Sequence, residues 1–462
     1  MLLAPIIVFA HYAQRAPFPS QTPEAAAETA RWLVHDSEWG TLSSLHATAD
    51  GTAPQPLGTT VSFSDGARGS STGRLFFYLM GADSVLSGDP HASFTLSEAA
   101  RHNNTCGSVD PQDPRCAKLT LSGALRVCTG DDEATGRAAL FARHPQMAKW
   151  PASHAFTVVE LAIDDIWMID FYGGGSAVDL GLYKVAPPRN NRPTWPPKPP
   201  SAVVEHSREA PSVAHTRRSL AVRLVQDEFH AAEQGIHGEL MMKEWHRPVP
   251  AGRMSAAHAP RPPRGAAPPH TSALGFPGPR PPWNETATRA RWLVYHSIWS
   301  VVSTSSTRQP TAGRAWGNVR SIADGMKANS TGLPVLYLPT PDPTAKDVAA
   351  DARVSLSFSE AALPALLTPG VGTPCAGTDA EDPTCARITL IGSLKKLDGV
   401  EATKAAYDLG VRHPLAPWLA SGGAHTGGAY FRIELERVVF LDYYGGPAHL
   451  SVEEYLAAPT PQ

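Results

Sequence analysis

Long apolar runs are missing from this 462-residue chain, and so is a strong net charge. No stretch approaches the roughly 18 apolar residues that a membrane-spanning helix needs. The formal net charge is -3, from 40 basic and 43 acidic residues, which provides no basic face for nucleic acid. We therefore expect no transmembrane segment and no nucleic-acid partner.

The short motifs of the common enzyme classes are also missing. The chain has no Walker loop, no HExxH, no GxGxxG and no Ser-His-Asp order. Its residues therefore predict no catalytic site and no metal site.

Cysteine is scarce, but four of the five residues follow one pattern twice. Cys106 and Cys116 are ten positions apart, as are Cys375 and Cys385, and each second cysteine follows an Asp-Pro dipeptide and one further residue. Zinc ligand pairs usually lie closer together, so the repeated spacing favours two disulfides, which persist in oxidising compartments. Cys128 is left over as a buried thiol.

Two further features indicate export. Residues 1–27 begin with the apolar stretch MLLAPIIVFAHYA, which is similar to the core of a signal peptide. Acceptor sequences for N-glycosylation occur at Asn103, Asn284 and Asn329. Together with the disulfides, they predict a secreted or endolysosomal glycoprotein.

An internal duplication organises the chain into two domains, at residues 28–185 and 288–457. Six landmarks recur in the same order, which is the signature of a repeat. They are RWLVHDSEWG and RWLVYHSIWS, STGRLFFYLM and STGLPVLYLP, SFTLSEAA and SLSFSEAA, DPRCAKLTLSG and DPTCARITLIG, ARHP and VRHP, and IDFYGG and LDYYGG.

Each copy has the pattern of an α+β domain in which strands dominate. The opening stretch has helical spacing at Ala30, Leu33 and Val34 and ends in Trp39, and short runs of alternating polar and apolar residues follow. Thus Phe76, Tyr78 and Met80 share one strand face, while Lys118, Thr120 and Ser122 lie opposite Leu119 and Leu121. Residues 132–144 and 399–413 each read as one helix that ends before a proline.

The segment between the copies, residues 186–287, is expected to be a linker. Much of the chain's unusual content of 44 prolines lies in it, and such stretches are extended or irregular. Within it, residues 219–245 have the spacing of one helix.

The repeated landmarks resemble the CREG family of secreted glycoproteins. The resemblance rests on the Ser-Asp-Gly at 64–66, FFYL at 76–79, DPHASFTLS at 89–97, CAKLTLSG at 116–123, Arg-His-Pro at 143–145 with Trp-Pro at 150–151, and DFYGG at 170–174. It implies two tandem split β-barrels of the FMN-binding, pyridoxamine-phosphate-oxidase type. It also implies a non-catalytic glycoprotein that acts through contacts with a protein or receptor partner.

The same resemblance raises an alternative, an FMN- or haem-binding protein with redox activity. Flavoenzymes of this superfamily hold the FMN phosphate with paired cations, because a buried dianion needs charged partners. The corresponding stretches here lack such a pair, although Lys346 offers one cation. Ser71 and Thr72, repeated as Ser330 and Thr331, are weak candidates for an anion site. No cofactor is expected.

Histidines and tryptophans recur at equivalent points of the two copies. His144 and His413 suit a helix C-terminus, where a positive imidazole meets the helix dipole, although acid/base or haem-ligating roles are the alternative. His154 and His425 are read as structural loop residues in the same way. Trp39 and Trp299 are expected to anchor the core at helix ends.

We expect the two copies to pair as a pseudo-dimer within the chain. Tethering raises the effective concentration of the pair to about the millimolar range. A face built for pairing is expected to be apolar, so that pairing hides it from water.

Overall fold

The computed structural model describes residues 21–193 and 280–459, with gaps at 49–50, 52, 82–85, 87, 102–105, 107–108, 173, 190, 327–328, 364–373, 415 and 417–426. The first 20 residues, Asn103, His425 and the expected linker helix lie outside the described residues. No helix within the described ranges combines the length and apolar character that crossing a membrane requires.

The first copy folds as one barrel with three helices, which we call barrel 1. Helix α1 begins at Pro23, ahead of the expected domain start at 28, because Thr22 caps it and proline suits its first turn. In chain order the elements are α1 Pro23–Asp36, β1 Trp39–His46, β2 Gln55–Ser62, β3 Leu75–Met80, β4 His91–Ser97, η2 Glu98–Ala100, β5 Lys118–Val127, α2 Asp131–Arg143, η3 Pro145–Lys149, η4 Ala152–His154, β6 Phe156–Ile169, β7 Ser176–Ala177 and α3 Leu180–Val185.

The second copy, barrel 2, repeats this order and adds helix α6 after β10. Its helix α5 begins at Thr286, two residues before the expected start. The elements are α5 Thr286–His296, β8 Trp299–Ser305, β9 Ala315–Ala323, β10 Val335–Leu338, α6 Pro343–Ala350, β11 Arg353–Ser359, η7 Glu360–Ala362, η9 Pro374–Gly377, β12 Arg387–Lys396, α7 Gly399–Arg412, β13 Ala429–Leu441, β14 Ala448–Leu450 and α8 Val452–Ala457.

The sheet of each copy is antiparallel and closes on itself. In barrel 1 the strand order is β2-β1-β4-β5-β6-β3, and a bridge between Ser64 and Phe76 joins the chain after β2 to β3. In barrel 2 the order is β10-β9-β8-β11-β12-β13-β14, and pairing of β10 with β13 closes the ring. The predicted fold class, two tandem β-dominated barrels, is confirmed.

The alternation of residues along β3 separates the barrel interior from a helix-covered flank. Leu75, Phe77 and Leu79 belong to the main core of barrel 1. Phe76 and Tyr78 point the other way and pack with Leu140 of α2 and its neighbours, as the period of two predicts. The helices predicted at 132–144 and 399–413 are present as α2 and α7.

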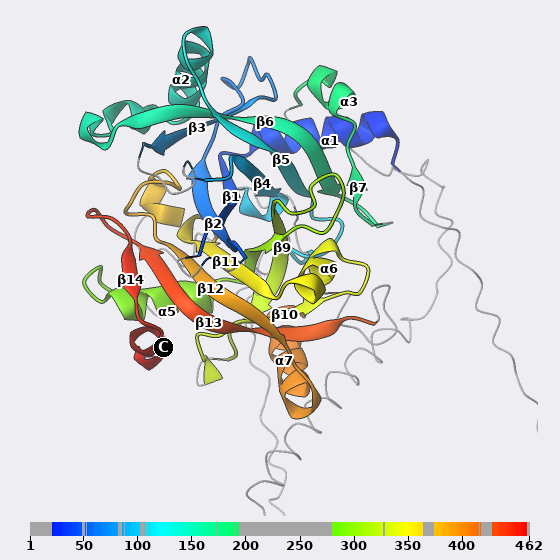
Figure 1. Ribbon diagram of the computed structural model, residues 1–462, viewed down its shortest axis with the longest axis vertical. Coiled ribbons are helices and arrows are strands. Elements are labelled where there is room, and N and C mark those ends of the chain that lie inside the picture. Colours follow the sequence, from blue (N-terminus) through cyan, green and yellow to red (C-terminus); the bar gives the residue numbers. More distant parts are fainter. Residues whose placement is uncertain are drawn as a thin grey trace, which may run out of the picture.

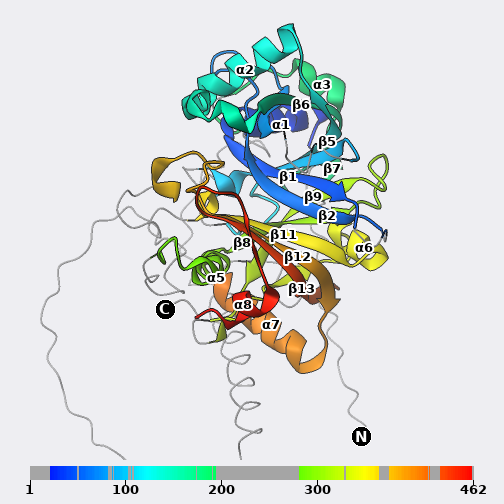
Figure 2. The same cartoon turned by 60° about the vertical axis from the view of Figure 1, so that its left-hand side comes forward.

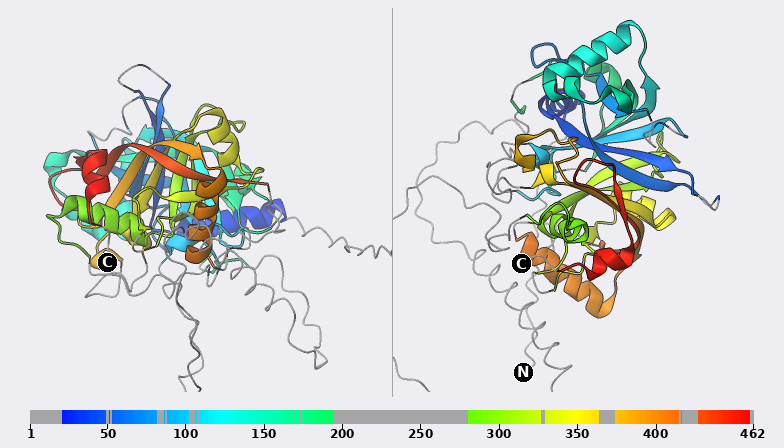
Figure 3. Two further views of the ribbon diagram at one scale, coloured as in Figure 1. Left: turned by 90° about the horizontal axis from the view of Figure 1, so that it is seen from below. Right: turned by 90° about the vertical axis from the view of Figure 1, so that its left-hand side faces the viewer.

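The two barrels are stacked through their strands. Figure 1 shows barrel 1, coloured blue to green, above barrel 2, coloured yellow-green to red, with β1 and β2 beside β9 and β11. Figure 2 and Figure 3 show the same arrangement from other sides, with α2 and α7 at opposite ends of the stack. The face between the barrels is therefore made of strands from both copies.

The structure contains both disulfides that the spacing predicts, Cys106–Cys116 and Cys375–Cys385, while Cys128 is a buried free thiol. Replacing Cys106 and Cys116 together with serine is expected to lower the free energy of unfolding by about 2 to 3 kcal/mol, since the bridge limits the unfolded chain. Urea midpoints measure the loss, and Cys128→Ala, which keeps both bridges, is the control. Free thiols at all four paired positions in protein from a secretory host would contradict the assignment.

Candidate functional site at the face between the two barrels

The polar side of β5 lies against barrel 2 and not against solvent. Lys118, Thr120 and Ser122 are each at most 4% exposed. The hydroxyl of Thr120 donates to the carbonyl of Gly317 at 2.8 Å, and the hydroxyl of Thr389 in barrel 2 donates to the carbonyl of Gly58 at the same distance. The face between the barrels thus carries matching hydrogen bonds in both directions.

Small hydroxyl side chains fill the centre of this face. The hydroxyls of Ser43 and Ser303, one from each copy, are 2.9 Å apart. The backbone N–H of Gly317 donates to Ser93 Oγ and that of Gly58 donates to Ser355 Oγ, both at 3.0 Å. Our expectation of an apolar pairing face is therefore wrong at this centre. Directed hydrogen bonds between closely approaching strands satisfy these buried polar groups instead.

Two histidine–carboxylate pairs cross the face in a symmetric way. His144 Nδ1 lies 2.7 Å from Asp379 Oδ2, and His413 Nδ1 lies 2.5 Å from Asp110 Oδ2. All four side chains are at most 4% exposed. Each histidine ends its helix as predicted, but sequence reasoning missed its carboxylate partner on the cysteine loop of the other copy.

Both ring nitrogens of each of these histidines face acceptors. His144 Nε2 is 2.8 Å from the carbonyl of Phe63, and His413 Nε2 is 2.9 Å from that of Ile322. Two acceptors are satisfied only when both nitrogens carry protons, so the geometry describes an imidazolium next to a carboxylate. His144 and His413 therefore have no ring nitrogen left to ligate a haem iron.

The two partner carboxylates are stabilised in their charged form. Burial by itself would raise the pKa of Asp110, but the charge and hydrogen bond of His413, with further bonds from Ser321 and Gln112, bring it below its usual range. His144 lowers the pKa of Asp379 against burial in the same way. A buried ion pair is tolerated here because each member is also hydrogen-bonded.

Trp39 and Trp299 anchor the face between the barrels and not the ends of helices. They begin β1 and β8, and their rings stack on each other with centroids 6.3 Å apart and planes 11° apart. Both are 7% exposed or less. The expected buried role is present, but the position at helix ends was wrong because each helix stops three residues earlier.

Lys118 is a buried cation held by its own cysteine loop. Its ammonium donates to the carbonyls of Pro111, Asp113 and Cys116 at 2.8 to 3.2 Å. Burial, with the nearby charge of Arg320 from barrel 2, lowers the pKa of Lys118 to about 7. All three donors of the ammonium have acceptors, so Lys118 fastens the loop that carries Asp110.

The repeated Ser-Thr-Gly loops are filled by the chain's own carboxylates. In barrel 2 the backbone N–H groups of Thr331 and Gly332 donate to Asp324 Oδ1 at 3.0 and 2.8 Å, and Ser330 Oγ donates to its other oxygen at 2.7 Å. Burial raises the pKa of Asp324, which these bonds oppose. The loop considered as an anion site therefore donates its hydrogen bonds to Asp324.

The equivalent loop of barrel 1 is also closed by an aspartate, but Thr72 bonds to its backbone carbonyl and not to its carboxylate. Ser71 donates to a carboxylate oxygen of Asp65, and the hydroxyl of Thr72 donates to the Asp65 carbonyl at 2.8 Å. Lys346 lies exposed on α6, which carries neither of these loops. The residues that the sequence offers for an FMN phosphate therefore do not fit one.

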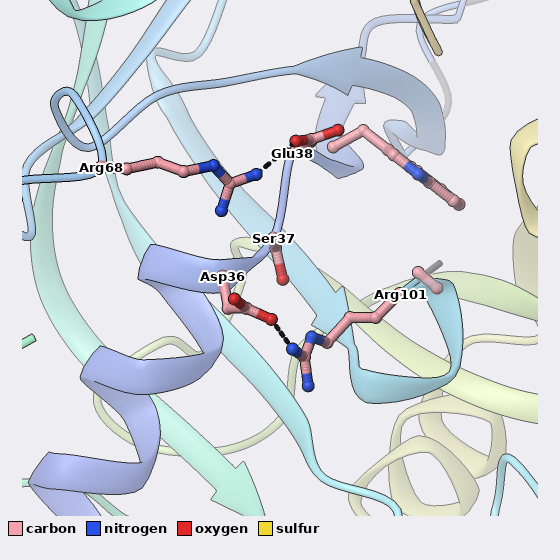
Figure 4. A pocket seen from close by; sticks show the side chains of 7 residues that line it. Asp36, Ser37, Glu38, Arg68 and Arg101 are labelled. Carbon is pink, nitrogen blue, oxygen red and sulfur yellow. Dashed lines mark hydrogen bonds and ion pairs between the residues drawn. The ribbon is translucent and has the colours of Figure 1, made fainter. Parts of the chain in front are cut away.

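A small hollow lies beside the end of α1, as Figure 4 shows. Its volume is about 140 Å³, below the roughly 300 Å³ at which ligand pockets usually begin. Asp36 pairs with Arg101, and Glu38 lies 2.6 Å from Arg68, so the charged side chains that line the hollow are paired with each other.

His154, which the sequence predicts to be a structural loop residue, is exposed, and its ring lies near the ring of Phe156.

The aspartate of the Asp-aromatic-Tyr-Gly-Gly corner is buried in both copies. Burial raises the pKa of Asp442 to about 6, although Arg280 opposes the shift. Arg289 Nη1 lies 3.5 Å from its carboxylate. Asp170, the equivalent residue, accepts from Gln21 at 2.7 Å, and burial raises its pKa as well.

Asp442→Asn is expected to remove this carboxyl's own contribution to stability, which grows on acidification from pH 7 to pH 5. The unfolded carboxyl has a pKa of about 3.9. The folded carboxyl, at about 6, therefore contributes stability that is fully present below about pH 4 and is lost as pH rises through 6. Urea midpoints of the wild type and the variant are measured at the two pH values. The difference between their pH dependences is the contribution of Asp442, since the two proteins share all other titrating groups. An identical pH dependence in the variant would contradict the assignment.

A family model described as "CREG, beta-barrel" matches residues 21–184 and again residues 281–457. These two regions make up well over half of the chain. The chain belongs to the CREG β-barrel family. The resemblance inferred from the landmarks is therefore confirmed, and so is the presence of two CREG copies in tandem.

Each CREG relative matches about one barrel's length of this chain. Human Protein CREG2 is 37% identical over 172 residues, which are 36% of this chain and 58% of that protein. Human Protein CREG1 is 34% identical over 169 residues, which are 36% of this chain and 76% of that protein. The chain thus spans less than two thirds of the CREG2 protein that it matches.

Solved structures with some likeness to this CREG chain include a heme binding protein from Mycobacterium smegmatis. That structure is 22% identical, has a TM-score of 0.29, and is matched over 35% of this chain and 61% of its own. ChuZ from Campylobacter jejuni is 6% identical with a TM-score of 0.26, over 36% of this chain and 59% of its own.

Proposed function

We propose that this CREG protein is a non-catalytic glycoprotein of the secreted or endolysosomal space that acts by binding a protein or receptor. An exposed aromatic cluster carries the proposal. Trp283, Tyr443 and Tyr444 are 58%, 42% and 64% exposed. The ring centroids of Trp283 and Tyr443 are 4.9 Å apart, and those of Tyr443 and Tyr444 are 5.4 Å apart. Clustered exposed aromatic rings are typical of binding surfaces.

The chemistry of the polar residues supports binding over catalysis. Asp324 and Asp65 fill the loops considered for phosphate, and the ring nitrogens of His144 and His413 are consumed by hydrogen bonds. These groups stabilise the fold and the face between the barrels.

Cell binding tests the role of the aromatic cluster. Labelled full-length protein is applied to cells that bind it, and replacing Trp283 and Tyr444 with alanine is expected to weaken binding at least about tenfold, as for central aromatic contacts. Val400→Ala is the matched control, because Val400 is 73% exposed on α7 and stands outside the cluster. Equal binding by both variants would remove the cluster from the proposal.

Absorption spectroscopy tests the cofactor alternative. Protein purified from a secretory host is expected to show no flavin or haem band and to leave added FMN and haemin unbound in equilibrium dialysis. A stoichiometric chromophore, or saturable binding of either compound, would replace the proposal with the FMN- or haem-binding alternative.

Glycan occupancy tests the compartment. Asn284 and Asn329 are both exposed, and the two disulfides suit an oxidising compartment. Mass spectrometry of peptides from secreted protein is expected to find hexosamine at Asn284, with Asn284→Gln as the control that loses this mass. Secreted protein without glycan at any acceptor site would count against export by the glycosylating route.

A further inference from the structure

Arg308 of barrel 2 reaches into barrel 1 at one edge of the face between them. Its two terminal nitrogens both contact the carboxylate of Asp165 on β6, one of them at 3.3 Å. Its guanidinium carbon lies 4.9 Å from the ring centre of Trp167 and 4.8 Å from that of Trp316. The side chains of Arg308 and Asp165 are 16% and 7% exposed. A planar guanidinium is suited to this combination of a carboxylate with two aromatic faces.

The turn that carries Arg308 is held in place before any partner arrives. Asp347 on α6 accepts from Thr304 Oγ1 at 2.8 Å and from the N–H and hydroxyl of Thr307 at 2.7 Å. The hydroxyls of Ser306 and Thr311 lie 3.0 Å apart across the turn. A turn fixed in this way presents the arginine with little ordering cost on pairing.

Among the residues that the structure describes, the contact has no counterpart at the opposite edge, because the two copies differ at both of its ends. In barrel 1, Asp165 pairs with Ser122 directly before the register shift between β5 and β6. In barrel 2, Arg437 pairs with Ile391 directly before the same shift between β12 and β13, so Asp165 and Arg437 occupy equivalent positions. Barrel 2 therefore has exposed Arg437 where barrel 1 has Asp165. Counted from the tryptophan that begins each first strand, barrel 1 has Thr48 in place of Arg308.

Because of these differences, the three possible pairings of the barrels are expected to differ in stability. Barrel 1 with barrel 2 joins Arg308 to Asp165. Two copies of barrel 2 would bring Arg308 to Arg437, and like charges at an interface repel. Two copies of barrel 1 would leave Asp165 buried next to Thr48 without a cation, which is costly.

We propose that Arg308 and Asp165 form a specificity lock that makes the pairing face of barrel 1 select barrel 2. The occupant of this face is then the other half of the same kind of chain and not a second copy of the same barrel. Specificity of this type rests on repulsion in the wrong pairs as much as on attraction in the right one. The tandem arrangement thereby becomes an obligatory heterotypic pair.

A cleavable form of the full chain tests the lock. A protease site is placed between residues 194 and 279, the purified protein is cleaved, and native mass spectrometry with serial dilution measures how the two halves associate. Wild type is expected to give one-to-one pairs of unlike halves. Arg308→Asp is expected to raise the dissociation constant at least about 100-fold, the range for breaking a buried pair.

A matched control uses the ion pair next to the lock. Arg314 Nη1 lies 2.7 Å from Asp164 Oδ2, with side chains 25% and 46% exposed, so Arg314→Ala is expected to weaken association by no more than about fivefold. Adding Asp165→Arg to Arg308→Asp is expected to recover at least tenfold, which misfolding of the single variant would not allow. Homotypic pairs from wild-type halves, equal effects of Arg308→Asp and Arg314→Ala, or no recovery in the double variant would each overturn the lock.

Discussion

Replacing Asp110 with alanine is expected to lower the free energy of unfolding by about 3 to 5 kcal/mol, because it leaves a buried histidine without its counter-charge. Asp110 and His413 are 4% and 2% exposed in their side chains, and Asp110 also accepts from Ser321 Oγ at 2.5 Å and from the N–H of Gln112 at 2.9 Å. Urea unfolding measures the loss.

The surface pair of Asp89 and His91 is the matched control for this variant. Its Nδ1–Oδ1 distance is 2.7 Å, against 2.5 Å in the pair of His413 and Asp110, but the two side chains are 40% and 35% exposed. Asp89→Ala is therefore expected to cost no more than about 1 kcal/mol, because water screens the pair. A similar loss in both variants would show that the pair across the barrels has no special role.

Valine at Gly58 and Gly317 is expected to separate the two barrels while each barrel stays folded. A Cβ atom at Gly317 would lie 2.3 Å from Thr95 Oγ1, and one at Gly58 would lie 2.4 Å from Ser357 Oγ, each on the other barrel. Both glycines lie inside strands, where valine is otherwise favoured, so the obstacle is the close approach of the barrels.

Small-angle scattering of the full chain measures the separation. Wild type is expected to scatter as a compact particle, and the double variant as two bodies with a larger radius of gyration. Gly69→Val is the control, since nothing lies within 4 Å of a Cβ atom at that position. An unchanged scattering curve for the double variant would mean that the barrels do not pair in solution through this face.

Local patterns in the sequence determined the repeat, the α+β class, the two helices predicted at 132–144 and 399–413, and the disulfide spacing. Each landmark, helix and cysteine pair depends on residues that are close together in the chain, where period and spacing are directly readable. The strand alternation also separated Leu119 and Leu121 from Thr120 correctly, since the leucines lie in the core.

Only the tertiary structure decided what the polar strand faces contact. A period of two distinguishes a polar face from an apolar one, but it does not say whether water or another polar face covers it. His144 and Asp379 are 235 positions apart, and His413 and Asp110 are 303 apart. No local pattern links residues at such separations, and the symmetry of the two pairs appears only when the barrels are stacked. The contact between Arg308 and Asp165 likewise appears only in the tertiary structure. Its selectivity depends on the equivalent residues of the other copy, which are Thr48 for Arg308 and Arg437 for Asp165.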